Sequence, residues 1–443
     1  MTDGRWMTAA ELGREIGAGR IDPVELAESF LAAIAAHPEG ARIYARATPD
    51  RALAEAAAAR DRARAGWRRG PLDGVPVSWK DLFDTAGIAT EAGSRLLEGR
   101  VPAADAEVLA TATRGGLVCL GKTHMSELAF SGLGLNPMTA TPPHVRDAAG
   151  VPGGSSSGAA ASVAFGLAPL AIGSDTGGSV RIPAAWNDLV GLKTTWGRLS
   201  LAGVVPLCES LDTVGPIGRS VEDMALALAA LEGGEPADLS GADLRGRRIA
   251  RLTTVALDGL RPAPAAGFDR AVAALEAAGA RVEDLAAPEV AAVLDLAGIV
   301  FSTEAYAIWR DVIEAAPERM FPEILARFRG GQAHSGADYV AALRRMAALR
   351  HDWAARVAGF DAVILPTAPI LAPDAARLLS DRDYYVTENL LALRNTRIGN
   401  MLGLCALTLP TGVPGTGLQI LGPAGGEAAL LRIGAAAEAA LAA

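Results

Sequence analysis

The chain reads VPGGSSSGAAASVAFGLAPLAIGSDTGGS from Val151 to Ser179, and this stretch decides what we predict for both fold and chemistry. Two clusters rich in glycine and serine, residues 153–158 and 177–179, flank residues 159–174, which carry no charge. Because glycine adopts positive φ and lets a backbone approach a ligand closely, such clusters predict amide N–H groups that face an anion or a carbonyl oxygen. The uncharged residues predict a buried helix followed by a buried strand.

A serine hydroxyl is a poor nucleophile until a base takes its proton, and no histidine lies in this stretch. The base must come from another segment, and the candidate is Lys80, which ends the apolar run Val75-Pro76-Val77-Ser78-Trp79. A lysine can accept a proton only if its pKa falls well below about 10.4, which desolvation in a pocket achieves. In the structural alternative, Lys80 only forms an ion pair with a carboxylate such as Asp81.

These segments resemble the amidase signature family of serine amidohydrolases. The resemblance rests on Lys80, on GGSSSG at residues 153–158 and on DTGGSVRIPA at residues 175–184. Lys80 precedes Ser155 by 75 residues, and Ser155 precedes Ser179 by 24 residues. Further matches extend the resemblance over most of the chain: Gly121-Lys122-Thr123, Gly191-Leu192-Lys193, Ser210-Leu211-Asp212-Thr213-Val214-Gly215-Pro216 and Gly417-Leu418-Gln419-Ile420.

The resemblance implies a fold of the α/β class, an amidase-signature sandwich in which helices cover both faces of a central mixed β-sheet. It implies hydrolysis of a small carboxamide to a carboxylic acid and ammonia through an acyl ester on Ser179. In this mechanism Ser155, in a cis conformation that Gly154 makes sterically possible, passes the proton of Ser179 to Lys80. No metal and no other cofactor is expected.

The residues before Ser179 predict an oxyanion hole. Ser179 lies at the start of a helical stretch, where free N–H groups and the helix dipole favour negative charge. The backbone N–H groups of Thr176, Gly177, Gly178 and Ser179 itself are the expected donors to a developing oxyanion. The two glycines have no side chain that would keep a substrate carbonyl away.

By the same resemblance, Asp175, Arg181 and Asp212 are expected to fix the nucleophile loop rather than to bind substrate. Ala129 and Phe130 are expected to line the acyl pocket, with further walls from residues 300–400. The candidates for those further walls, which core positions would explain equally well, are Phe301, Tyr306, Trp309 and Leu391.

Other motifs suggest rival chemistry. Residues 116–123 read GLVCLGKT and match the nucleotide-binding pattern G-x-x-x-x-G-K-[ST]. The four middle residues are themselves an apolar strand, so no phosphate-binding loop remains, and Lys122 is expected to be structural or near the pocket rim. The histidines and cysteines are scattered, without metal spacing or a basic neighbourhood for a thiolate: His124, His144, His334, His351, Cys119, Cys208 and Cys405.

The composition restricts partners and compartment. The chain has 443 residues, 50% hydrophobic and 21% charged, and a net charge of −9, which argues against nucleic acid as a partner. Three cysteines in apolar contexts fit a reducing compartment, and the charged N-terminus does not read as a signal peptide. We therefore expect a cytoplasmic enzyme with a small-molecule amide substrate, no membrane partner and a possible homodimer.

One domain is expected over residues 1–443, with an N-terminal helical part (1–65), a catalytic core (66–232), a peripheral, helical, substrate-facing part (233–381) and a C-terminal return to the core (382–443). Strands and helices alternate as in an α/β sandwich. Strands are expected near 74–80, 117–120, 170–172, 248–252, 362–365, 406–409 and 418–421, and helices near 23–34, 49–65, 105–114, 156–166, 220–231, 263–278, 335–356 and 426–441.

Two other functions stay open. The first is the glutaminase subunit of a tRNA-dependent amidotransferase, which performs the same chemistry but channels ammonia to a partner protein. The second is an inactive ligand-binding protein that keeps the fold. The presence of Lys80, Ser155 and Ser179 together argues against an inactive protein.

Overall fold

The computed structural model describes residues 4–443, in which eleven strands form one mixed β-sheet. The strands are β1 (Tyr44–Ala47), β2 (Pro76–Lys80), β3 (Val118–Thr123), β4 (Ala171–Ser174), β5 (Val190–Lys193), β6 (Val214–Gly218), β7 (Arg248–Leu252), β8 (Arg281–Leu285), β9 (Ala362–Pro366), β10 (Cys405–Pro410) and β11 (Gly417–Gly422). Across the sheet they follow the order β1-β3-β2-β4-β6-β5-β10-β11-β9-β7-β8.

Parallel and antiparallel pairs occur side by side in this sheet. Strand β2 is parallel to β3 and β4, and β7 is parallel to β8 and β9. The middle of the sheet is antiparallel, from β4 through β6, β5, β10 and β11 to β9. The predicted mixed central sheet is therefore confirmed.

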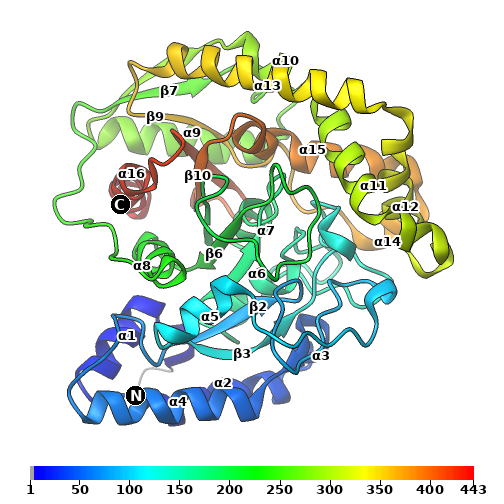
Figure 1. Cartoon of the computed structure of the whole chain (residues 1–443). Coiled ribbons are helices and arrows are strands. Elements are labelled where there is room, and N and C mark those ends of the chain that lie inside the picture. The colour runs from blue at the N-terminus through cyan, green and yellow to red at the C-terminus, as the bar shows by residue number, and fades with distance from the viewer. Residues whose placement is uncertain (1–3) are drawn as a thin grey trace.

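Helices surround the sheet: α1 (Ala9–Gly17), α2 (Pro23–Ala36), α3 (Gly40–Ile43), α4 (Pro49–Arg64), α5 (Glu107–Arg114), α6 (Ser157–Ala164), α7 (Arg181–Trp186), α8 (Val221–Glu232), α9 (Pro262–Ala277), α10 (Pro288–Asp295), α11 (Ala297–Ala315), α12 (Pro322–Arg329), α13 (Gly336–Val357), α14 (Ala375–Ser380), α15 (Arg382–Met401) and α16 (Glu427–Ala442). The first helices lie at the bottom of Figure 1, where α2 and α4 cover the end of the sheet that holds β1 and β3.

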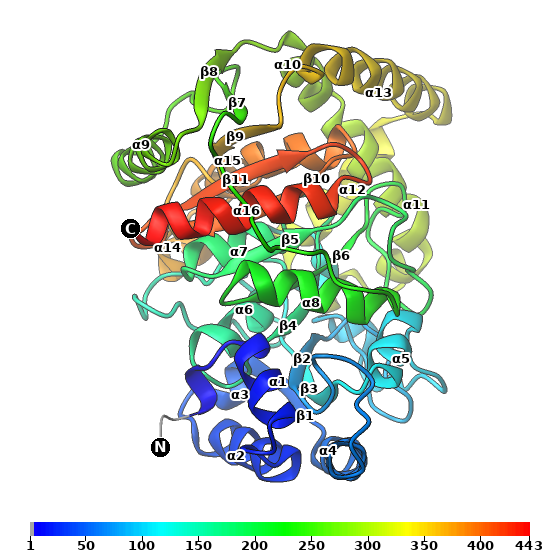
Figure 2. The ribbon, with the colours of Figure 1, turned by 90° about the vertical axis from the view of Figure 1, so that its left-hand side faces the viewer.

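The helices cover both faces of the sheet, as predicted. Figure 2 shows α8 and α16 in front of the central strands, with α6 and α7 behind them. Helix α16 packs on β10 and β11, whereas α6 packs on β2, β4 and β6, and α7 on β5, β10 and β11. The catalytic signature of the sequence therefore lies on one face of a covered sheet.

Helix boundaries follow local capping chemistry. Pro23 begins α2, and the Asp22 carboxylate accepts the N–H of Val24. The Ser220 hydroxyl caps α8, which ends at Gly233 with φ of 71°, a left-handed conformation that glycine adopts without strain.

Four strands of the sheet were not predicted: β1, β5, β6 and β8. Each has only four or five residues, and β5 and β6 contain glycine, which weakens the alternating pattern. Strand β8 is an edge strand with three exposed residues, so its sequence carries no continuous apolar run. The segment 233–381 contributes β7 and β9, which were predicted near 248–252 and 362–365, and the unpredicted β8 to the common sheet.

The uncharged stretch after Val151 is a buried helix and a buried strand, α6 and β4, as predicted. By length and composition, one stretch of the described residues, Pro288–Ala315, is apolar enough to cross a membrane, and 28% of its most apolar window is buried. This stretch consists of two helices, α10 and α11, which pack against α13.

Parallel pairing of β2 with β4 brings the lysine segment to the signature loop. Trp79 lies opposite Ile172, so both strands run towards the same edge of the sheet. Lys80 is the last residue of β2, and Ser174 is the last residue of β4. The loop that leads from Ser174 to α7 therefore begins beside Lys80.

A buried ion pair fixes that loop. The Arg181 guanidinium at the start of α7 donates to both carboxylate oxygens of Asp175, at 2.9 and 3.0 Å, and neither side chain is exposed. Arg181 also donates to the carbonyl oxygen of Thr396 at 2.8 Å, the Gln419 amide oxygen at 2.7 Å and the Asn400 amide oxygen at 2.6 Å. One side chain thus joins the loop to α15 and β11.

Burial would raise the pKa of Asp175, but the charge and hydrogen bonds of Arg181 outweigh burial and hold that pKa well below its ordinary value. The carboxylate also accepts the N–H groups of Gly178 at 2.8 Å and Val180 at 3.1 Å. Asp175 is therefore an anion that organises the backbone on both sides of Ser179.

We expect Asp175→Asn to lower the free energy of unfolding by about 3–5 kcal/mol, because it leaves the Arg181 charge buried without a partner. Denaturant unfolding checks this. A control is Glu222→Gln, which breaks the exposed pair that Glu222 forms with Arg14 at 2.6 Å and should cost about 0–1 kcal/mol. Equal costs for the two substitutions would contradict the role given to Asp175.

Candidate active site

Lys80 is completely buried, and its partners are hydroxyl groups rather than a carboxylate. Its Nζ lies 2.7 Å from Oγ of Ser155 and 2.8 Å from Oγ of Ser174. Burial lowers the pKa of Lys80 to about 7, although the charges of Asp175 and Asp212 partly oppose this shift. A lysine in this setting exchanges its proton near neutral pH.

The structural alternative for Lys80 is wrong. The neighbouring carboxylate of Asp81 pairs with Arg46 and with Nζ of Lys122, each at 3.2 Å. Lys122 is buried and also donates to the Thr90 hydroxyl at 2.9 Å. Lys122 is thus structural, as predicted, and the sequence that resembles a phosphate-binding loop contributes the buried strand β3.

Ser155 follows a cis peptide bond between Gly154 and Ser155. Gly154 is tightly enclosed, because a Cβ there would lie 2.6 Å from the backbone nitrogen of Gly134 and 2.7 Å from Oγ of Ser126. The N–H of Ser156 donates to the carbonyl oxygen of Ser179 at 3.2 Å. The two serine clusters of the sequence therefore lie next to each other, with Lys80 against the first.

Asp212 holds the loop before Ser179 from the other side. Its carboxylate accepts the Thr176 hydroxyl at 2.6 Å and the N–H groups of Leu207 and Cys208 at 2.9 and 3.1 Å. Burial raises the pKa of Asp212 to about 6. Asp175, Arg181 and Asp212 therefore all contact the loop or its flanks, as the resemblance implied.

The predicted oxyanion hole needs one correction. The Gly178 N–H donates to Asp175 and is not free for a substrate oxygen. Within residues 4–443 the N–H groups of Thr176, Gly177 and Ser179 have no acceptor. Gly178 is nevertheless required for space, because its φ is +131° and a Cβ there would lie 2.0 Å from the Thr396 hydroxyl.

Ser179 lines a narrow neck of about 10 Å³ that adjoins a wider cavity of about 400 Å³. Ala129 and Phe130, the predicted acyl-pocket residues, both line the neck. The neck and the wider cavity share four lining residues: Phe130, Phe301, Arg327 and Arg397. The two spaces therefore adjoin each other at these four residues.

Of the wall candidates between residues 300 and 400, Phe301 lines both spaces. Tyr306, Trp309 and Leu391 line neither, and Trp309 instead donates its indole N–H to the carbonyl oxygen of Pro206 at 2.9 Å. Ser174, Arg327 and Arg397 were not predicted. Ser174 lies in the signature stretch itself, one residue before Asp175. Sequence spacing offers no signal for Arg327 and Arg397, because α12 and α15 reach the site only through the tertiary fold.

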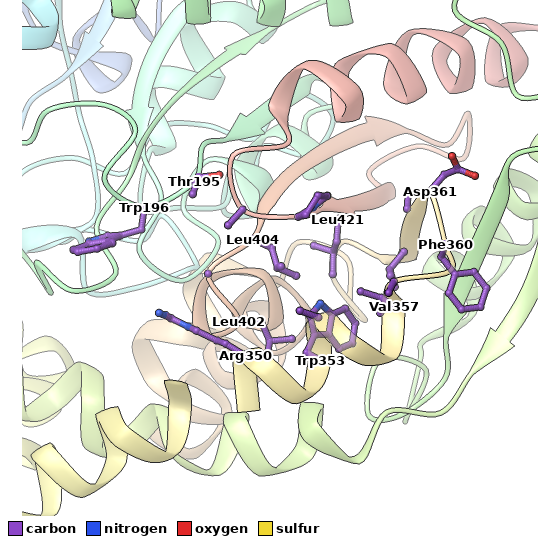
Figure 3. A pocket seen from close by; sticks show the side chains of 18 residues that line it. Thr195, Trp196, Arg350, Trp353, Val357, Phe360, Asp361, Leu402, Leu404 and Leu421 are labelled. Atoms are coloured by element: carbon purple, nitrogen blue, oxygen red, sulfur yellow. The ribbon is translucent and has the colours of Figure 1, made fainter. Parts of the chain in front are cut away.

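A larger cavity of about 490 Å³ lies elsewhere, between α13 and the segments that follow α15 and β11. Figure 3 shows Trp353 and Leu402 among its mostly apolar walls. Its charged residues have protein partners, since Arg350 donates to a backbone oxygen at 2.8 Å and Asp361 pairs with an arginine at 2.9 Å. It shares no lining residue with the neck beside Ser179 and contains no serine.

The histidine rivals receive no support from these contacts. Burial lowers the pKa of His124, and the backbone oxygen of this residue, not its ring, accepts hydrogen bonds from the cluster, at Gly158 and Ser157. His144 lies against the carbonyl oxygen of Trp186 at 2.9 Å. Neither imidazole has a hydrogen bond to Ser155 or Ser179 in the part of the chain that the structure describes.

Comparison with known proteins agrees with this geometry. The family model described as Amidase matches residues 25–431. The chain is 38% identical to 2-amino-5-chloromuconic acid deaminase of Comamonas testosteroni, over 84% of this chain and 82% of that protein. It is 34% identical to one of the subunits of the glutamyl-tRNA(Gln) amidotransferase of Acidothermus cellulolyticus, over 98% and 94%. The peptide amidase structure from Stenotrophomonas maltophilia matches with a TM-score of 0.81 and 29% identity, over 99% and 97%. The chain therefore belongs to the amidase family and is a hydrolase of carbon–nitrogen amide bonds.

Proposed function

We propose that the protein hydrolyses a small carboxamide to a carboxylic acid and ammonia through an acyl ester on Ser179. The observation that carries the proposal is the buried Lys80, whose Nζ contacts the Ser155 hydroxyl at 2.7 Å and, among residues 4–443, pairs with no carboxylate. The lowered pKa of Lys80 makes the neutral amine available near pH 7. Ser155 in turn lies in the cluster that is hydrogen-bonded to Ser179.

In the first half-reaction, neutral Lys80 takes the proton of Ser155 while Ser155 takes the proton of Ser179. The Ser179 oxygen attacks the amide carbon, and the carbonyl oxygen becomes an oxyanion that accepts the free N–H groups of Thr176, Gly177 and Ser179. The proton held by Lys80 returns through Ser155 to the amide nitrogen. The C–N bond breaks, ammonia leaves, and the acyl group stays on Ser179 as an ester.

The second half-reaction uses the same relay for water. A water molecule gives one proton through Ser155 to Lys80, and its oxygen attacks the ester carbon. The tetrahedral intermediate collapses, the proton returns to the Ser179 oxygen, and the carboxylic acid leaves. Lys80 ends neutral, so the enzyme is ready for a second substrate.

The glutaminase subunit remains the second candidate, because the relative from Acidothermus cellulolyticus belongs to a glutamyl-tRNA(Gln) amidotransferase. The relative from Comamonas testosteroni, named as a deaminase of 2-amino-5-chloromuconic acid, favours a small-molecule enzyme instead. The two functions differ in whether the isolated chain releases ammonia. Ammonia release by the purified protein, shown by gel filtration to contain no other protein, would support the small-molecule amidase.

We propose a cytoplasmic location and a homodimer as its working form.

Ser179→Ala should reduce amide hydrolysis to a trace while the thermal midpoint stays within a few degrees. The substitution removes one hydroxyl, whereas the chemistry loses its only covalent acceptor. Ammonia release and thermal unfolding measure the two effects. The matched control is Ser157→Ala, which removes a hydroxyl from the other cluster that donates only to the carbonyl oxygen of His124. Substantial turnover in Ser179→Ala would contradict the assignment.

Hydroxylamine should divert the acyl enzyme into a hydroxamate, since the ester on Ser179 reacts with any small nucleophile that enters the neck. The ferric complex of the hydroxamate gives a colour that quantifies the partition against free acid. Direct attack of water on the amide would yield acid without hydroxamate, and this result would exclude the acyl ester.

The rate should fall below about pH 7 as Lys80 becomes protonated, because the protonated amine cannot take the Ser155 proton. Lys80→Arg should be nearly inactive at every accessible pH, since a guanidinium keeps its proton. The profile of kcat/KM against pH measures the acid limb.

Asp212 also titrates in this range, so Asp212→Asn is the control. The Asp212 charge raises the pKa of Lys80, and its removal should move the acid limb to lower pH without abolishing the limb. Loss of the limb in Asp212→Asn, together with an active Lys80→Arg enzyme, would assign the titration to Asp212.

A further inference from the structure

Two arginines stand where the wide cavity meets the neck beside Ser179. Arg327 comes from α12 and Arg397 from α15, two helices that the chain brings together only in three dimensions. Both line the 400 Å³ cavity and the neck, and both are half-buried. They are therefore cationic groups on the path that a substrate takes to Ser179.

Neither arginine has a carboxylate partner. Within residues 4–443, no hydrogen bond or ion pair involves Arg327 or Arg397, and the Nε atom of each is buried without an acceptor. Their neighbours are aromatic rings: the Arg327 guanidinium lies 4.5 Å from the centre of Phe130, and that of Arg397 lies 5.4 Å from the centre of Phe301. Burial lowers the pKa of each, and the charge of Arg327 adds to this effect on Arg397.

This arrangement differs from the other charged groups of the same cavity. Glu323, the acidic residue of the wider cavity, is already paired with Arg382 at 3.2 Å. A buried positive charge is costly unless it is paired, and two neighbouring ones repel each other. The chain thus keeps two unneutralised cations beside the nucleophile, which is favourable when the ligand brings the negative charge.

We propose that the substrate carries a carboxylate at the end remote from the scissile amide, and that Arg327 and Arg397 bind it. This inference rests on the proposed function, whose amide must lie at Ser179. A carboxylate is planar and matches the fork of a guanidinium with two parallel hydrogen bonds. The aromatic rings of Phe130 and Phe301 pack against the guanidinium groups and hold them facing the path. The substrate class is therefore the half-amides of linear dicarboxylic acids.

The first test compares substrates that differ only in charge. Succinamate and adipamate are paired with 4-oxopentanamide and 6-oxoheptanamide, in which a methyl ketone replaces the carboxylate. We expect kcat/KM to be about 100-fold higher for the better half-amide than for its neutral partner, because charge-assisted hydrogen bonds form only with the carboxylate. 3-Phosphonopropanamide, which carries a tetrahedral anion, should be a poorer substrate than succinamate.

The second test changes the arginines. Arg327→Gln and Arg397→Gln should each lower the preference for half-amide over neutral amide at least tenfold, chiefly through KM, and the lysine variants should restore part of it. Arg329→Gln is the matched control, because Arg329 lies on the same helix as Arg327 but is exposed, pairs with Glu314 at 2.7 Å and lines neither the wide cavity nor the neck. It should leave the preference as it is in the unchanged protein.

A third measurement does not need turnover. Succinate or adipate, the dicarboxylate products, should bind to the Ser179→Ala protein in calorimetry, and Arg397→Gln in that background should abolish the binding heat. A loss of folding in the arginine variants would appear in their thermal midpoints, and the lysine variants then decide the question.

The outcomes separate the two proposals. Hydrolysis that depends on Ser179 but shows no preference for the half-amides, or that favours the phosphonate, overturns the carboxylate site and leaves the amidase mechanism intact. The same holds if neither dicarboxylate binds to Ser179→Ala. If no amide hydrolysis depends on Ser179 but the dicarboxylates bind in a way that requires Arg397, the carboxylate site is supported and the proposed hydrolysis is contradicted.

Discussion

The buried pair of Asp175 and Arg181 is the interaction on which the rest of this structure depends. It places an anion at the start of the loop that carries Ser179 and a cation at the start of α7. Because both charges are inaccessible to water, the pair is stable only with its complete set of hydrogen bonds to α15 and β11. The geometry of the loop that carries Ser179 is therefore linked to the packing of the C-terminal part of the chain.

The pairing of charges also explains the state of Lys80. The carboxylate next to it in sequence, Asp81, is neutralised by Arg46 and Lys122, and within the described part of the chain Lys80 has hydroxyl partners alone, Ser155 and Ser174. The two carboxylates that raise the pKa of Lys80, Asp175 and Asp212, accept hydrogen bonds from the loop that carries Ser179. Their effect on this pKa is smaller than the opposite effect of burial. A buried amine without an ion-pair partner is the arrangement that lets a lysine work as a base at neutral pH.

Charge also distinguishes the entrance of the site from its centre. At the centre, Asp175 and Arg181 neutralise each other, whereas Arg327 and Arg397 have aromatic neighbours but no anionic partner among residues 4–443. Helices α12 and α15 thus place two positive charges in the walls of the cavity next to Ser179. The geometry of the loop that carries Ser179 depends on Asp175 and Arg181, whereas the charge of its surroundings depends on α12 and α15, so separate parts of the chain determine the two features.

The sequence by itself determined the α/β class, seven of the eleven strands, about half of the helices, and the segments that hold Lys80, Ser155 and Ser179, because these follow from local periodicity and from short glycine–serine segments. The short strands β5 and β6, the exposed edge strand β8, and β1 escaped prediction because their pattern is too brief or too polar. Only the tertiary structure decided that Gly178 donates its N–H to Asp175 and that Arg327 and Arg397 meet beside Ser179. Hydrogen-bond partners and unpaired charges depend on groups far apart in the chain, and no local pattern records which of them come together.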